Sequence, residues 1–335
     1  MLDLLKSLCQ LDGTSGNEKA VREFIINEIK GHCEYKVDNL GNIICFKKGK
    51  NRSERRLMLD AHIDEVGLII TAVTSDGFLK FDTVGGMDTS VLAFKTVKIG
   101  DILGIISSKP VHLLSKEEHK KTQNVAALYI DIGATSKEEA LSLISLGDTA
   151  VIQSDFTKMG ENIKAKAIDD RIGCAVLITL LKEKAEYDYY AVFSTQEEIG
   201  TRGARVATFT VNPDFALILE ATTAADIAGV SDDKTVCNLG DGPAVSFMDR
   251  ATAYDRELYS AAINSGLKVQ TKRAVAGGNN AGAVHLSREG VRTLAVSLPC
   301  RYIHSPSCVA NTNDMTDMLN LTKYMMNGIL SGEIK

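Results

Sequence analysis

The sequence predicts an α/β protein into which a second, β-rich domain is inserted. This prediction rests on a change of pattern along the chain. Before Gly67 and again from Ile163 onward, amphipathic helices accompany short apolar runs of the kind that form buried strands. Between these segments, short strands follow one another with glycine and aspartate turns, which is typical of a small β barrel or sandwich. We therefore expect a discontinuous α/β domain at 1–67 and 162–335 and an inserted domain at 68–161.

Composition indicates a soluble protein of the cytoplasm. With 335 residues, 44% hydrophobic and 24% charged, the chain can bury a large core in more than one domain. A formal net charge of −5 argues against nucleic acid as a partner, because nucleic-acid binders usually carry a basic face. No apolar run reaches the ~18 residues of a membrane span, and the N-terminus lacks a signal peptide's basic start. The seven cysteines include no Cys-x-x-Cys pair, which favours a reducing compartment over disulfides.

Two helices and a strand pair are expected before the insertion. Ser15-Gly16-Asn17-Glu18 reads as a capping box that opens the second helix, whose apolar face would cover a sheet. The expected elements are a helix at 2–11, a helix after 18, strands at 34–37 and 43–46, and an exposed basic loop at 47–56.

The inserted domain is expected to consist mainly of strands. They are predicted at 68–73, 78–82, 91–94, 96–99, 102–107 and 126–131. A polar loop at 115–121 and a capped helix beginning at Ser136 complete the segment. None of the candidate site residues below lies in it.

After the insertion, a helix from Ile172 to about Lys184 follows the pair Asp169-Asp170. Carboxylates at a helix N-terminus are stabilised by free N–H groups, so capping alone could explain one aspartate of the pair. The glycine-rich stretch 277–282 does not have the spacing of a phosphate-binding motif. A last helix is expected at 313–330.

Four apolar runs end in potential metal ligands. A single histidine or glutamate after a strand is usually a packing or surface residue, but four such endings in one chain are harder to attribute to chance. In open α/β sheets, ligands bind outside the carboxyl ends of the strands. The four endings are His62 with Asp64, Glu197 with Glu198, Glu220, and His304.

These side chains predict a centre with two metal ions. His62, His304, Asp170, Glu198 and Glu220 suit two borderline divalent ions that share a bridging carboxylate, and zinc, cobalt and manganese all fit. Such a pair can hold a hydroxide and polarise a carbonyl group. Glu197 would then serve as the general base, and Asp64 would orient the His62 imidazole.

Four motifs carry a resemblance to a known family. They are AHIDEVG at 61–67, DDRIG at 169–173, EEIGTRGA at 197–204 and YIHSP at 302–306. The chain resembles, over nearly its whole length, the glutamyl-aminopeptidase and tetrahedral aminopeptidase family, some members of which carry a cellulase M or endoglucanase label. The resemblance implies a mixed-sheet α/β/α exopeptidase domain and an inserted dimerisation domain.

The same resemblance implies a role for each site residue. His62 and Glu220 would bind one metal ion, Glu198 and His304 the other, and Asp170 would bridge the two. It also implies Glu197 as general base, Asp64 as support for His62, and dimers that can associate into a hollow shell of twelve subunits. The sieving by such a shell would admit short peptides only.

Two positions depart from the family pattern. Glu220 stands where the family often has aspartate, and the extra methylene could shift metal preference. Asn280 stands where the glycine-rich loop commonly carries an aspartate, so a negative charge near the site is lost. We expect a cytoplasmic aminopeptidase with two divalent ions per subunit. The alternatives are an endoglucanase-like glycoside hydrolase, whose two carboxyl groups would flank a sugar, and a non-catalytic scaffold.

Overall fold

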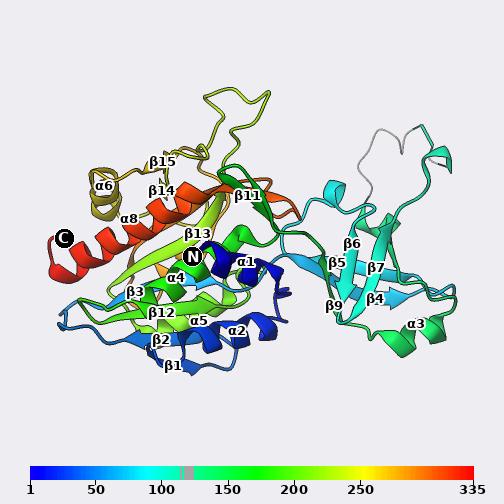
Figure 1. The fold of residues 1–335 in the computed structure, drawn as a ribbon, viewed down its shortest axis with the longest axis horizontal. Coiled ribbons are helices and arrows are strands. Elements are labelled where there is room, and N and C mark those ends of the chain that lie inside the picture. The colour runs from blue at the N-terminus through cyan, green and yellow to red at the C-terminus, as the bar shows by residue number, and fades with distance from the viewer. Residues whose placement is uncertain (114, 117–123) are drawn as a thin grey trace.

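The computed structural model describes residues 1–113, 115–116 and 124–335 and divides into two lobes (Figure 1). One lobe holds a mixed sheet between helices, and the other is a closed barrel of six antiparallel strands. This confirms the predicted fold class. In the described part of the chain, no helix is both long and apolar enough to cross a membrane.

The sheet of the α/β lobe has four parallel strands at its centre. They run side by side in the order β12, β3, β13, β16, and the strands that flank them are antiparallel. Parallel strands need both faces covered, which agrees with the burial of every residue of β3. In spatial order the strands are β1 (Glu34–Val37), β2 (Ile43–Lys47), β12 (Tyr189–Ser194), β3 (Leu57–His62), β13 (Phe215–Thr223), β16 (Arg292–Arg301), β17 (Cys308–Asn311), β11 (Asn162–Ala165) and β10 (Thr157–Met159), with β14 (Ala244–Ser246) and β15 (Gln270–Lys272) beside β16.

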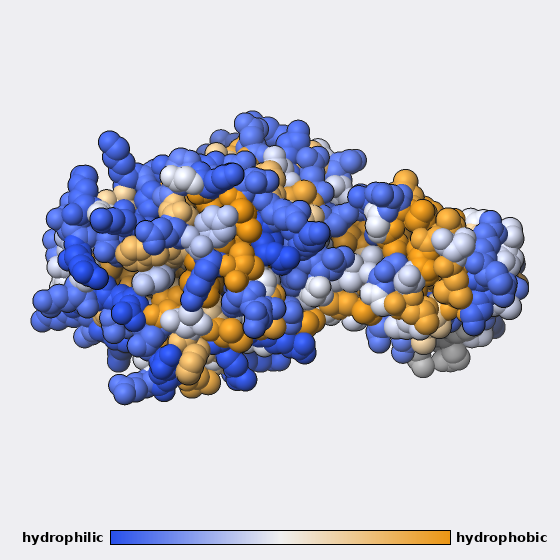
Figure 2. All heavy atoms as spheres, turned by 90° about the horizontal axis from the view of Figure 1, so that it is seen from below, coloured by the Kyte–Doolittle hydropathy of each residue, from blue (hydrophilic) through white to orange (hydrophobic). Residues whose placement is uncertain are grey.

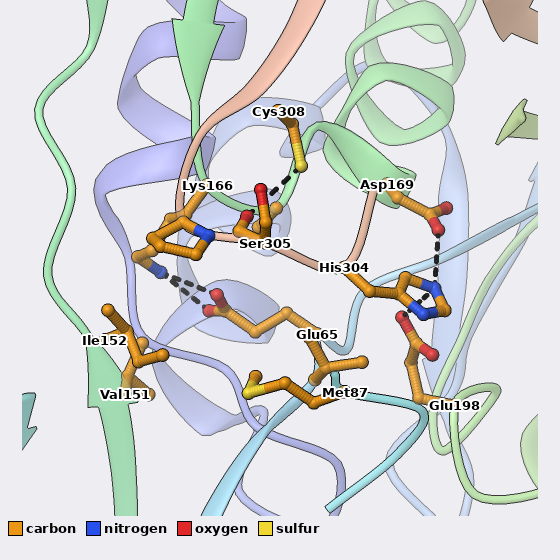
Figure 3. Close-up of a pocket in the computed structure, with 13 residues that line it drawn as sticks. Glu65, Met87, Val151, Ile152, Lys166, Asp169, Glu198, His304, Ser305 and Cys308 are labelled. Atoms are coloured by element: carbon orange, nitrogen blue, oxygen red, sulfur yellow. Dashed lines mark hydrogen bonds and ion pairs between the residues drawn. The ribbon is translucent and has the colours of Figure 1, made fainter. Parts of the chain in front are cut away.

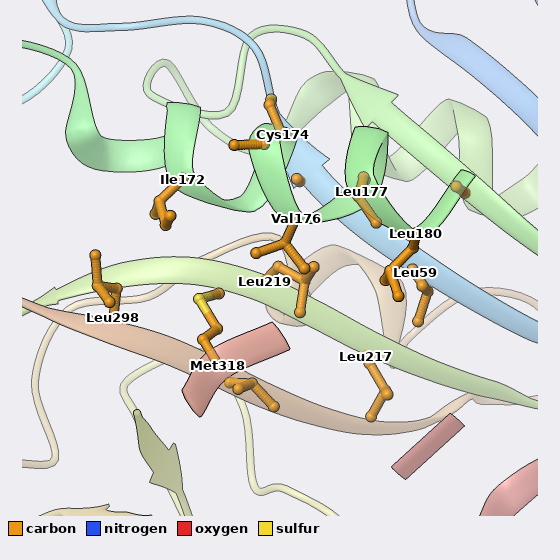
Figure 4. Packing of buried hydrophobic residues seen from close by; sticks show 14 of the residues in the cluster. Leu59, Ile172, Cys174, Val176, Leu177, Leu180, Leu217, Leu219, Leu298 and Met318 are labelled. Atoms are coloured by element: carbon orange, nitrogen blue, oxygen red, sulfur yellow. The ribbon is translucent and has the colours of Figure 1, made fainter. Parts of the chain in front are cut away.

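Helices cover both faces of this sheet. Leu57 and Leu59 of β3 pack with the helices of one face, and Met58 between them packs with those of the other, as the alternation of a strand requires. Figure 4 shows α4 and α8 over the first face. That face packs against α1 (Leu2–Gln10), α2 (Lys19–Ile29), α4 (Ile168–Lys182), α6 (Arg256–Ile263) and α8 (Thr312–Ser331), and the second against α5 (Arg202–Val211) and α7 (Ala281–Val284).

The barrel has a hydrophobic core of its own. Its helix α3 (Lys137–Leu143) is capped as predicted, since the Ser136 hydroxyl accepts a hydrogen bond from the Glu139 amide. Around the barrel the strands are β4 (Gly67–Val73), β5 (Leu79–Val84), β8 (Tyr129–Asp131), β7 (Ile102–Ser107), β6 (Thr96–Ile99) and β9 (Thr149–Ile152), with short 3₁₀ turns at Thr89–Val91, Val111–Leu113 and Val125–Ala127. Figure 2 shows apolar surface on this lobe.

Four local expectations differ from the structure. The strand expected at 126–131 begins only at Tyr129, because a 3₁₀ turn occupies Val125–Ala127. Residues 91–94 form no strand, because the Asp88 carboxylate caps the 3₁₀ turn that begins at Thr89. Ser15 does not cap α2, because its hydroxyl donates instead to Asp64 Oδ2 at 2.6 Å. Strand β10 pairs with β11 in the large sheet, so we propose that the inserted domain ends before β10 and not at residue 161. Most of the expected polar loop at 115–121 lies outside the described residues.

Candidate active site

The candidate side chains meet at the carboxyl edge of the parallel strands. His62 ends β3, Glu197 and Glu198 follow β12, Glu220 lies near the end of β13, and His304 follows β16. Because parallel strands end at one edge of a sheet, residues far apart in the chain are brought together there.

Two groups of potential metal ligands share one carboxylate, that of Asp169. His62 Nε2 lies 3.3 Å from Asp169 Oδ1 and 3.7 Å from Glu220 Oε2. His304 Nε2 lies 3.2 Å from Asp169 Oδ2 and 3.4 Å from Glu198 Oε1. Within each group the ligand atoms are within 4.8 Å of one another, and His62, Glu197 and Glu198 form a third such group.

The structure does not bring Asp170 into these groups. Its Oδ1 accepts a hydrogen bond from the Gly173 amide at 2.9 Å, and its Oδ2 accepts one from the His62 amide at 3.2 Å. The peptide bond that joins Asp169 to Asp170 is cis. Of the two aspartates, Asp170 is therefore the one that caps the helix and supports the backbone, while Asp169 faces both imidazoles. The other four expected ligands are brought together.

Asp64 connects His62 to the Glu197-Glu198 turn. Its Oδ1 accepts from the Glu197 amide at 3.0 Å, and its Oδ2 accepts from the Glu198 amide at 3.1 Å. Oδ1 also lies 3.5 Å from His62 Nδ1, and the Asp64 main-chain oxygen lies 3.0 Å from the same nitrogen. These contacts outweigh burial and lower the pKa of Asp64.

The crowding of acids and imidazoles displaces their pKa values. Burial, followed by neighbouring acids, raises the pKa of Glu197 to about 7 and that of Glu198 to about 8, and it also raises the pKa of Glu220 well above its usual value. Burial alone would lower the pKa of His304, but Asp169 and Glu198 outweigh it and raise that pKa to about 10. A site with this many mutually repelling carboxylates is suited to divalent cations.

A cavity of about 770 Å³ opens beside these residues. Glu197, Glu198, Glu220 and His304 form part of its wall. The lining also includes small residues of the glycine-rich stretch together with Lys272 and Arg205. A smaller cavity at the junction with the barrel is bordered by Glu65, Lys166 and Cys308 (Figure 3). The larger cavity has the volume of typical small-ligand sites.

Residues 41–321 match the family described as M42 glutamyl aminopeptidase. The chain is a member of the M42 glutamyl aminopeptidase family. Its structure is similar to that of an aminopeptidase from the archaeon Desulfurococcus kamchatkensis, with a TM-score of 0.92 and 32% identity over 99% of this chain and 96% of that one.

Two further solved structures cover nearly the whole M42 chain. The TET1 peptidase of Pyrococcus horikoshii, which can assemble into a tetrahedron or a large octahedral shell, aligns with a TM-score of 0.84 and 32% identity over 97% of this chain and 98% of that one. An endoglucanase from Thermotoga maritima aligns with a TM-score of 0.80 and 33% identity over 98% and 97% of the two chains. The predicted resemblance, including its endoglucanase-labelled members, is thereby confirmed.

Sequence reasoning missed a buried ion cluster beneath the M42 site. Glu65 Oε1 accepts from Lys166 Nζ at 2.7 Å, from Arg171 Nη2 at 3.1 Å and from the Gly13 amide at 3.0 Å. Removing one partner from such a buried cluster costs about 3–5 kcal/mol. Glu65 and Arg171 stand inside two of the family motifs, so the motifs were the available signal. Their role is to fix the backbone on which His62 and Asp169 sit.

A second missed contact involves the departure at Asn280. Its Nδ2 donates to Asp60 Oδ2 at 2.7 Å and to Ser194 Oγ at 2.9 Å. Asp60 and Asn280 are both fully buried. A carboxylate on β3 therefore faces the loop at the position where the family commonly has its acid. The glycine-rich stretch is tied by this contact to the strand that carries His62.

The backbone around the site is held in a sparsely populated conformation. Ala167, Gln196, Thr201 and His304 have φ values of 53°, 56°, 52° and 58°, in the left-handed region. Each such residue costs on the order of 1–3 kcal/mol, which the surrounding contacts must offset. Ala167 lies just before Asp169, Gln196 and Thr201 lie on either side of the Glu197-Glu198 pair, and His304 is itself a candidate ligand. The strain is therefore concentrated where the ligand side chains leave the sheet.

Proposed function

We propose that this M42 protein is a metal-dependent aminopeptidase that releases N-terminal residues from short peptides. The observation that carries the proposal is the Asp169 carboxylate, which lies between two histidine–carboxylate groups on the wall of a cavity large enough for a peptide end. Family membership supports the reaction class.

The residues present fit two divalent ions per subunit. His62 and Glu220 would hold one ion and Glu198 and His304 the other, with Asp169 shared between them in place of the expected Asp170. Imidazole and carboxylate donors suit zinc, cobalt or manganese. Glu220 Oε1 is buried without a hydrogen-bond partner, as expected of an oxygen reserved for a cation. Glu220, although longer than aspartate, reaches the group.

The remaining chemistry falls to Glu197. Bound divalent ions polarise a carbonyl group and make water easier to deprotonate. Glu197 lies at the cavity wall and in one group of potential metal ligands with His62 and Glu198, so it can take a proton from the attacking water and deliver it to the leaving amine. Asp64 accepts hydrogen bonds from the Glu197 and Glu198 amides and contacts the His62 ring. It therefore fixes the position of the proposed base relative to the ligand groups.

Two alternatives are less well supported. Glycoside hydrolysis requires two carboxyl groups on either side of a sugar and has no use for His62, His304 and a shared Asp169. A scaffold that has lost catalysis would have no need to maintain Glu197 at the cavity wall beside a complete ligand set.

We also propose assembly through the inserted barrel. Phe94, Leu103 and Ile105 are 69%, 62% and 45% exposed, and Leu103 and Ile105 project from the same face of β7. Clustered exposed apolar residues favour an interface, and two-fold dimers are the commonest solution. By likeness to the Pyrococcus horikoshii tetrahedral shell and to a further solved TET1 structure that is a dodecamer, such dimers would associate further, up to a dodecamer. Seven free cysteines, of which only Cys33 is not buried, support a reducing, cytoplasmic setting.

A screen of aminoacyl anilides tests the function directly. The protein is stripped of metal, reloaded with cobalt, zinc or manganese, and assayed on each substrate. We expect turnover only after reloading, rising as metal content approaches two ions per chain. Turnover that persists after exhaustive chelation, or cleavage of cellulose oligomers without cleavage of any anilide, would contradict the proposal.

A further inference from the structure

A main-chain oxygen from the inserted barrel contacts one of the candidate metal ligands. His304 Nδ1 lies 2.7 Å from the carbonyl oxygen of Gly86. Gly86 lies two residues beyond the end of strand β5 of the barrel, whereas His304 follows β16 of the α/β lobe. A histidine whose Nδ1–H donates to a carbonyl presents Nε2 to a metal ion, and such outer contacts fix the ring orientation and tautomer. Here Nε2 faces Asp169 and Glu198.

The loop that carries this carbonyl is pressed against the site. Gly85 has φ of +83°, and a Cβ added there would lie 2.9 Å from Val66 Cγ1 and 3.2 Å from Glu198 Cβ. A Cβ added at Gly86 would lie 3.5 Å from His304 Nδ1, an ordinary contact distance, and Gly86 is outside the left-handed region. The Gly85-Gly86 loop therefore touches two of the three residues of one ligand group, and only glycine at 85 permits the approach.

The other ligand group is oriented from within the α/β lobe. His62 Nδ1 contacts the Asp64 main-chain oxygen at 3.0 Å, two residues along its own segment. Glu220 lies in β13, at the centre of the sheet. No barrel residue among those described is a hydrogen-bond or ion-pair partner of either side chain.

We infer that the barrel is a positioning element for one of the two metal sites, with the Gly86 carbonyl as the group that orients His304 and Gly85 as the residue that lets it reach the site. The inference rests on the proposed function. It revises the expectation that the insertion supplies nothing to the chemistry. The His304–Glu198 site depends on how the barrel docks on the α/β lobe, whereas the His62–Glu220 site does not.

Cobalt binding to metal-free full-length protein tests this unequal dependence. Calorimetric titration gives stoichiometry and affinity, and the visible absorption of bound Co²⁺ reports on the ligands. Wild type should bind two ions. In Gly85→Ala, the added methyl displaces the loop, so binding of one ion should weaken by roughly 10- to 100-fold, the scale for loss of an outer-shell contact, while the other ion binds as in wild type. Gly133→Ala is the matched control, because Gly133 is a barrel glycine with a similar φ of +80° and open space around an added Cβ, and it should bind both ions normally.

A second variant keeps the test independent of the strained backbone at position 85. Gly86→Val adds methyl groups toward the His304 ring at a residue without left-handed φ, and it should also lose one site selectively. Equal weakening of both ions in folded Gly85→Ala and Gly86→Val, or wild-type binding in both, would overturn the inference. Failure of wild type itself to bind any ion would overturn the proposed function, which is a separate result.

Discussion

The two lobes differ in the kind of side chain that they bury. The α/β lobe buries many ionisable side chains, among them Asp60, Asp64, Asp170 and Arg171, and surrounds them with hydrogen bonds. Among the described residues of 67–152, the buried side chains are apolar. Burying a charge costs free energy unless partners compensate it, so an ordinary core such as the barrel's avoids it. The α/β lobe buries charged groups in spite of this free-energy cost because its candidate site is built from them.

The lobes also contribute to the site through different parts of the chain. Among the described residues, the α/β lobe supplies side chains at strand ends, whereas the barrel contacts the ligand groups through the backbone of Gly85 and Gly86. Its exposed apolar residues, such as Leu103, lie on the outer surface. In our proposals catalysis and assembly are thus assigned to different lobes, and the Gly86 carbonyl is the described contact by which the barrel reaches a ligand group. The predictions below test this separation, beginning with the largest expected effect.

Replacing the proposed base should produce the largest loss. In Glu197→Gln the side chain keeps its shape but cannot accept the proton, so turnover should fall by about 10²- to 10⁴-fold. Metal content, measured by atomic emission, should stay at the wild-type value because Glu197 is assigned no ligand role. Glu198→Gln is the matched comparison, and it should lose both metal and turnover. Near-normal turnover in the Glu197 variant would contradict the assignment of Glu197 as the general base.

The two adjacent aspartates should differ in their effect on metal binding. Asp169→Asn removes a charge that both ligand groups share, so both ions should bind more than about 100-fold more weakly, beyond the range of an outer contact. In Asp170→Asn the new amide oxygen can still accept from the His62 or Gly173 amide, so we expect a loss of roughly 10-fold. Calorimetric titration of the metal-free proteins checks both values. The opposite ranking would restore Asp170 as the bridging residue.

Changes on the outer barrel should affect assembly and leave the chemistry intact. Leu103→Asp with Ile105→Asp places two charges in the proposed interface. Light scattering should therefore report monomers at micromolar concentration, where we expect wild type to be at least dimeric. Turnover of a small anilide should change by less than about 3-fold, within the small effects expected of surface changes away from the site. Leu146→Asp, at another exposed apolar position of the insertion, is the control. Unchanged assembly in the double variant would contradict the proposed interface.

Much of this architecture could be predicted because buried strands leave a recognisable pattern of apolar residues in the sequence. Buried parallel strands are continuous apolar runs, so β3, β12, β13 and β16 were recognisable, and their endings located the candidate ligands. Patterns that depend on local hydrogen bonding were less informative. Residues 91–94 are apolar enough for a strand, yet the neighbouring Asp88 cap turns the chain and leaves Phe94 exposed.

The remaining site details depend on contacts that no local pattern encodes. Asp169 and Asp170 are equivalent in sequence, and only their tertiary partners separate a ligand from a cap. Ser15 matches a capping box, but Asp64, 49 residues away, is its partner. The contact of Gly86 with His304 is made by a main-chain carbonyl group, which no sequence motif identifies. The endings of the apolar runs could place the chemistry at one edge of the sheet, whereas the assignment of individual groups required their geometry.

The smallest effect should come from exchanging the acid and the amide of the Asp60–Asn280 pair. Asn280→Asp would place two carboxylates against each other in a buried site. Thermal unfolding should therefore show that the free energy of unfolding falls by an amount on the order of 1–3 kcal/mol. Asp60→Asn leaves two amides that can still form one hydrogen bond, so its loss should be smaller. The double variant restores one acid and one amide and places the acid on the loop, where the family commonly has it. We therefore expect it to recover most of the stability lost by Asn280→Asp, with a coupling free energy of about 0.5–3 kcal/mol. If the changes in the free energy of unfolding of the two single variants simply add in the double variant, the two side chains are not coupled. Asp60 would then not replace the acid that is missing from the glycine-rich stretch.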